Sequence, residues 1–271
     1  MKNKLWLVFP AGLALTFLYG QGHVVPLAVY LLLDLAYVVG ATWLIRKDPR
    51  AGLFVVPAVL LFAVASYTGG PSADDPANLV INAGGLVLCA VALVLVSGVW
   101  VAALWDGPGR LPALLSLLLV LLGSAGYFAN LVSRFAVVLS GSAPAQAAVE
   151  DEAWMASEYL QGLESGDFMV VLLVCMDLLQ VAYVVLMYLA AALLVDALRR
   201  AGRMTTRAAS TLRGLGLVLA GLTVLGAVVG TAVPAGAYLA FGLSIPFMTT
   251  LLPSLMAGGY LTAPAVTPAT K

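Results

Sequence analysis

The stretch VLLVCMDLLQVAYVVLMYL, residues 171–189, is almost entirely apolar and carries a single charged side chain, Asp177. The stretch YLLLDLAYVVGATWLI, residues 30–45, has the same character and also holds one acid, Asp34. About 20 apolar residues are needed for one helical crossing of a bilayer. Because a segment in lipid must satisfy its own backbone hydrogen bonds, we expect both stretches to form transmembrane helices.

The composition of the whole chain agrees with this interpretation. Of its 271 residues, 62% are hydrophobic and 10% are charged, and the mean hydropathy is +1.05. Soluble domains carry about 25% charged residues. So few charges cannot cover a surface that faces water, so the composition predicts an integral membrane protein. The formal net charge of zero gives no general attraction to nucleic acid.

Apolar runs bounded by charged residues, Gly or Pro divide the chain into about eight spans. They predict an all-α, polytopic transmembrane helix bundle that forms a single domain over residues 1–271. The spans are expected near 5–20, 23–45, 51–67, 79–105, 111–139, 168–198, 212–233 and 237–261. Residues 148–163 have apolar side chains at helical spacing with acidic residues mostly off that face, which predicts an amphipathic helix on the outer leaflet.

The basic residues are distributed unevenly between the two sides of the predicted membrane. If the N-terminus is cytoplasmic, 12 of the 13 Lys and Arg residues fall in cytoplasmic loops and tails, and Arg134 is the exception. Such a bias sets the orientation of membrane proteins. We therefore expect both termini to be cytoplasmic, in a multi-pass protein of the cell (inner or plasma) membrane.

Asp34 and Asp177 are predicted to lie at similar depth in the membrane. Counted from the outer ends of their spans at 1.5 Å per residue, they lie about 15 Å and about 14 Å deep. Ionisable residues there face the bundle interior or a cavity and are functional candidates. A carboxyl group in a low dielectric holds a proton more readily, so the pair is expected to face each other and share a proton. The alternative is that they only bridge helices by hydrogen bonds.

Other polar residues accompany the two acids. Tyr30 and Tyr37 flank Asp34 at i−4 and i+3, and Gln180 follows Asp177 at i+3. The fifth span carries a polar stripe that includes Asn130 and Arg134, and we expect this span to contact the second and sixth spans. Arg134 either pairs with an aspartate or extends to lipid phosphate. The candidate proton, ion or substrate site is therefore Asp34, Asp177, Tyr30, Tyr37, Gln180, Asn130 and Arg134.

Several kinds of chemistry lack the residues that they need. His23 is the only histidine, which excludes bis-histidine haem ligation and a zinc site built from several histidines. No phosphate-binding loop motif is present. We therefore assign no catalytic residue, no metal ligand and no cofactor.

Three classes of function remain open. We favour proton- or cation-coupled transport of a small solute or ion through a polar site at the bilayer midplane. The alternative is a non-catalytic membrane partner or assembly subunit, because a helix bundle alone implies no function. A membrane enzyme acting on lipid is the third and least supported class. The expected partners are the lipid bilayer with a small solute, proton or cation, or another membrane protein.

Overall fold

The computed structural model describes residues 76–139 and 168–230, together with isolated helical positions between residues 29 and 43. Four helices make up the two longer ranges: α4 (Pro76–Ala103), α5 (Arg110–Leu139), α8 (Phe168–Arg200) and α9 (Thr206–Gly230). They fall on the expected spans 79–105, 111–139, 168–198 and 212–233. The other expected spans, both termini and the segment 148–163 lie wholly or largely outside the described residues.

Three of these helices contain stretches that are long and apolar enough to cross a membrane. The stretches are Arg110–Ser133 in α5, Val174–Arg200 in α8 and Thr206–Gly230 in α9, and a shorter apolar stretch, Leu93–Ala103, lies in α4. The described part of the chain is thus all-helical and compatible with a helical membrane protein, as the composition predicts.

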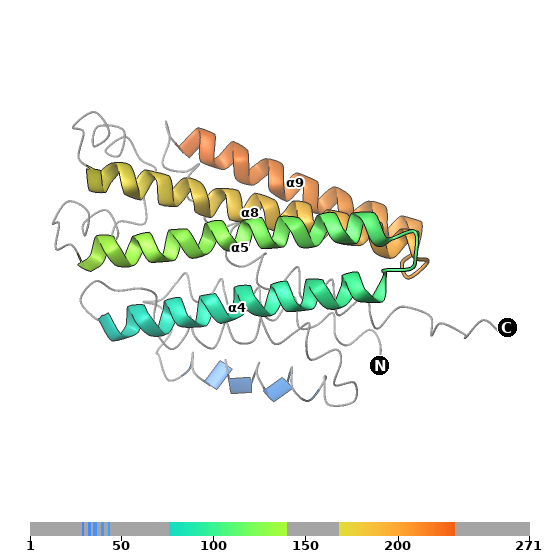
Figure 1. The fold of residues 1–271 in the computed structure, drawn as a ribbon, viewed down its shortest axis with the longest axis horizontal. Helices are drawn as coiled ribbons and strands as arrows, with labels where there is room; N and C mark the ends of the chain where they lie inside the picture. Colours follow the sequence, from blue (N-terminus) through green and yellow to red (C-terminus); the bar gives the residue numbers. More distant parts are fainter. Residues whose placement is uncertain are drawn as a thin grey trace.

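The four helices lie side by side in the order α4, α5, α8, α9 (Figure 1). Short loops join α4 to α5 and α8 to α9, so the helices of each of these pairs run antiparallel. Both loops lie at the same end of the bundle (Figure 1). We call this the loop end. The most extensive packing is between α5 and α8. The core between the helices includes Trp100, Val120, Met187, Tyr188 and Leu198.

Small or polar residues spaced seven apart bring α5 close to α8. Seven residues make two helical turns, the spacing at which helices pack along a shared seam with a crossing angle of about 20°. At one end of the seam, a Cβ added to Gly109 would lie 2.5 Å from the carbonyl oxygen of Ala197. The residues that face each other are Gly109 with Ala197, Ser116 with Ala190, Gly123 with Tyr183, and Asn130 with Met176.

The connection from α8 to α9 is fixed by local backbone chemistry. Gly202 has a φ of 69°, a left-handed conformation that suits glycine, and the Arg203 N–H donates to the Leu198 carbonyl at 2.9 Å. This is a Schellman ending, which satisfies carbonyl groups at the end of a helix. Thr205 then accepts a hydrogen bond from the Ala208 N–H at 3.3 Å and caps α9. The tight turn places the last residues of α8 beside the first turns of α9.

Candidate functional site

Asn130 is a fully buried side chain among the predicted site residues that the structure describes. It is 1% exposed, and its Nδ2 donates a hydrogen bond to the backbone carbonyl of Met176 on α8. Asn130 precedes the end of α5 at Leu139 by nine residues, and Met176 follows the start of α8 at Phe168 by eight. At 1.5 Å per residue the contact lies about 12–14 Å from the helix ends opposite the loop end. With 30 and 33 residues, α5 and α8 are longer than the roughly 20 residues that cross a bilayer, so the position of this contact at the bilayer midplane stays a prediction.

The other polar atom of this amide has no hydrogen-bond donor within the part of the chain that the structure describes. Among the described residues, the buried Oδ1 of Asn130 accepts no hydrogen bond. An unsatisfied buried acceptor costs about 1–3 kcal/mol. A water molecule, a hydroxyl, a protonated carboxyl group or a cation would satisfy it. Asn130 thus offers one buried acceptor to such a group at the contact between α5 and α8.

Aromatic and polar residues lie within two turns of this contact along α5 and α8. Tyr127, one turn before Asn130 on α5, stacks on Tyr183 of α8 with ring centroids 4.5 Å apart and an angle of 14° between the planes. Gln180 lies one turn after Met176 on α8 and is half-buried. Asn130, Met176, Tyr127, Tyr183 and Gln180 form what we call the α5–α8 polar seam.

The predicted site residues divide into those that the structure places and those that it does not. Asn130 and Gln180 belong to the polar seam. Asp177 follows Met176 directly on α8, and Arg134 lies one turn beyond Asn130 on α5, but their side chains lie outside the described set. Asp34, Tyr30 and Tyr37 also lie outside the described residues. The facing arrangement of Asp34 and Asp177 thus stays a prediction, as does the contact between the second and fifth spans.

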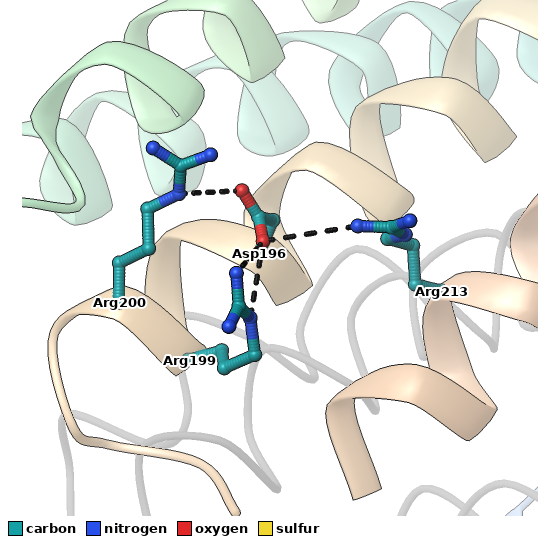
Figure 2. A network of polar contacts seen from close by, with 4 residues as sticks. All are labelled: Asp196, Arg199, Arg200 and Arg213. Atoms are coloured by element: carbon teal, nitrogen blue, oxygen red, sulfur yellow. Dashed lines mark hydrogen bonds and ion pairs between the residues drawn. The ribbon is translucent and has the colours of Figure 1, made fainter. Parts of the chain in front are cut away.

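A second polar centre, absent from the predicted site residues, lies at the loop end. Asp196 on α8 has a side chain only 9% exposed and sits among three arginines (Figure 2). Its Oδ1 accepts hydrogen bonds from Arg199 Nη2 at 2.8 Å and Nε at 3.2 Å, while Oδ2 accepts one from Arg200 Nε at 2.7 Å. Arg213, from α9, brings Nη1 to 4.0 Å from Oδ1. We call these four residues the arginine cluster.

The sequence contains a signal for this cluster. Arg199 and Arg200 follow Asp196 at i+3 and i+4, the spacing at which side chains meet on a helix. From the sequence alone, these arginines are interpreted only as a signal of the orientation of the chain in the membrane. The contribution of Arg213 depends on the α8–α9 turn, which local spacing does not reveal.

Two tryptophans near the short loops contact further arginines. The Arg110 guanidinium carbon lies 3.9 Å from the ring centroid of Trp105, and that of Arg203 lies 5.7 Å from Trp100. Cation–π contacts of this kind are attractive at these distances. Between residues 104–114 and 195–217, the loop end carries six arginines and two aspartates, an excess of four positive charges.

Within residues 76–139 and 168–230, no three His, Cys, Asp or Glu side chains gather as a metal ion would require. Comparison with known proteins gives no further guide, because no family, no curated protein and no solved structure matches the chain.

Proposed function

We propose that the chain is a multi-pass protein of the cell (inner or plasma) membrane that couples transport of a small solute or ion to protons or cations. The proposed pathway passes the α5–α8 polar seam near the bilayer midplane. The observation that carries this proposal is the buried Asn130 amide, whose Oδ1 has no hydrogen-bond donor among the described residues. Polar groups kept at such depth line ion and substrate pathways in membrane proteins.

The chemistry proposed for this site is reversible binding of a proton or cation. Asp177 follows the residue that binds Asn130, so a protonated carboxyl of Asp177 or a cation held by it would supply the missing partner of Oδ1. Asp34 is proposed as the second acid of the pair. Arg134, one turn beyond Asn130, either neutralises an aspartate or extends to lipid phosphate.

The proposed topology has eight spans with both termini in the cytoplasm. The loop end then faces the cytoplasm, and its six arginines follow the bias of cytoplasmic loops. In this topology the end of α5 at Leu139 and the start of α8 at Phe168 lie on the outer side, so the polar seam is reached from that side.

Proton flux into proteoliposomes tests the function. Purified protein is reconstituted in vesicles of phosphatidylcholine and phosphatidylglycerol that contain a pH-sensitive dye, and the membrane potential is clamped with K⁺ and valinomycin. We expect proton flux with wild type and none with Asp34→Asn or Asp177→Asn, because an amide makes similar hydrogen bonds but does not bind the proton. Equal flux in wild type and both variants would contradict the proposal. Absence of wild-type flux, together with a stoichiometric co-purifying protein, would favour an assembly subunit instead.

A further inference from the structure

An open hollow lies beside the arginine cluster, between the last turn of α8 and the first turns of α9. Its volume is about 350 Å³, within the range of about 300–1,000 Å³ typical of small-molecule sites. It is lined by Arg199, Thr206, Ser210, Arg213, Gly214 and Leu217. Two of the three arginines around Asp196 thus also line this hollow.

The charge of the hollow favours an anion. The arginine cluster contains three positive charges and one negative charge, an excess of two. An arginine has five N–H donors. Arg199 gives Asp196 hydrogen bonds from two nitrogens, while Arg213 approaches Asp196 only as an ion pair at 4.0 Å. Both guanidinium groups therefore retain N–H donors, and Asp196 holds Arg199 in a fixed position.

Neutral donors complete the lining. Thr206 and Ser210 lie one turn apart at the start of α9, and their hydroxyl groups can donate to an anionic oxygen. The N-terminal turn of a helix is also the positive end of its dipole. Arginine and hydroxyl donors in this combination suit a phosphate group, since guanidinium groups bind phosphate oxygens in pairs.

The shape of the hollow leaves room for such a group. A Cβ added to Gly214 would meet no atom within 4 Å, so this part of the lining is open. Leu217 continues the lining with an apolar side chain, further along a helix able to cross the membrane. Arginines at the ends of transmembrane helices lie at the level of the lipid headgroups.

We propose that the hollow between α8 and α9 binds a doubly charged phosphate monoester group, through Arg199 and Arg213 with the hydroxyl groups of Thr206 and Ser210. The two negative charges of a phosphate monoester balance the excess of two positive charges on the arginine cluster. A phosphodiester carries one negative charge and leaves one of the two positive charges unbalanced. The same chemistry is offered by a phosphatidic acid headgroup and by inorganic phosphate in solution.

Two variants with matched controls test the proposal by isothermal titration of the purified protein in detergent. Arg213→Gln removes a lining charge, and its control Arg207→Gln removes a charge from α9 outside the lining. Gly214→Leu fills the hollow without changing the charge. Its control is Gly221→Leu, also on α9, where an added Cβ likewise meets nothing within 4 Å. Arg213 is 55% exposed, so its substitution leaves the helix packing intact.

The ligands are dioctanoyl phosphatidic acid, inorganic phosphate and dioctanoyl phosphatidylcholine. We expect phosphatidic acid to bind wild type and both controls equally. It should bind Arg213→Gln about tenfold or more weakly, because a charge-assisted hydrogen bond is lost, and Gly214→Leu also more weakly, because the leucine side chain occupies the hollow. If inorganic phosphate binds as tightly as phosphatidic acid, the ligand is a soluble phosphate. If inorganic phosphate binds more weakly, the ligand is the lipid. Either result supports the site. No binding to wild type, equal binding of phosphatidylcholine, or equal losses in variants and controls would overturn the proposal.

Discussion

Asn130 of α5 donates its side-chain N–H to the backbone carbonyl of Met176 on α8. It is the last of four close approaches to α8 spaced seven residues apart, the first of which is at Gly109, directly before α5. Ser116, two repeats earlier, makes an equivalent bond from its Oγ to the Ala190 carbonyl at 2.7 Å. The two contacts differ in one respect. The Ser116 hydroxyl is satisfied, whereas the Asn130 amide keeps a buried oxygen without a donor among the described residues.

Replacing Asn130 by leucine is expected to leave the melting temperature unchanged or to raise it. Leucine has the same number and branching of side-chain heavy atoms as asparagine and removes the unsatisfied Oδ1, and the Met176 carbonyl keeps its place in the α8 backbone ladder. Thermal unfolding in detergent measures this. A fall in stability of more than about 2 kcal/mol would mean that the amide serves the packing of α5 on α8.

Gly109→Ala is expected to destabilise the protein by about 1–3 kcal/mol, the usual cost of overpacking. The new Cβ would lie 2.5 Å from the Ala197 carbonyl oxygen, so the loop before α5 must move away from α8. Gly221→Ala is the control, because its Cβ meets nothing within 4 Å and alanine favours a helix more than glycine does. Equal melting temperatures for the two variants would contradict the close approach.

Asp196→Asn is expected to destabilise the loop end by about 1–3 kcal/mol, since it leaves the neighbouring arginines without their counter-charge. The arginine side chains are 39%, 49% and 55% exposed, so solvent limits the loss. Combining Asp196→Asn with Arg199→Gln should cost less than the sum of the two single changes. Strictly additive losses in thermal unfolding would show that the ion pair contributes nothing.

Cysteine labelling tests the proposed orientation in a chain whose two native cysteines are replaced by alanine. Asp106→Cys and Met204→Cys place thiols in the two loops of the loop end, and Ser142→Cys places one in the predicted outer connection. An impermeant maleimide added to intact cells should label only Ser142→Cys. Labelling of the two loop-end thiols, with protection of Ser142→Cys, would reverse the orientation.

The sequence predicts the helices far better than it predicts their contacts. Long apolar runs bounded by Arg110 and Arg200 can only be helical in lipid, and α5 begins at Arg110 while α8 ends at Arg200. The polar stripe of span five also predicts its contact with span six, and the Ser116 and Asn130 side chains both donate hydrogen bonds to α8. Their partners are backbone carbonyls, which every residue carries. The register that selects Ala190 and Met176 depends on packing along the whole seam.

The arginine cluster shows a different limit. Asp196, Arg199 and Arg200 are local on one helix, so their spacing alone predicts their contacts. Arg213 joins them only because Gly202 and Thr205 reverse the chain within a few residues. From the sequence alone, these arginines are used only to orient the chain, and Asp196, the one acid among them, is therefore missed.

Proton flux through Asn130→Leu, compared with Ser116→Ala in the same reconstituted vesicles, distinguishes a transport path along the α5–α8 polar seam from a purely structural role of Asn130. Both variants remove a side-chain hydrogen bond from α5 to an α8 carbonyl, but only Asn130 offers an unsatisfied oxygen at the proposed site. We predict wild-type flux for Ser116→Ala, and loss of flux for an Asn130→Leu protein that melts at or above the wild-type temperature. Wild-type flux through Asn130→Leu would contradict a transport path along the α5–α8 polar seam.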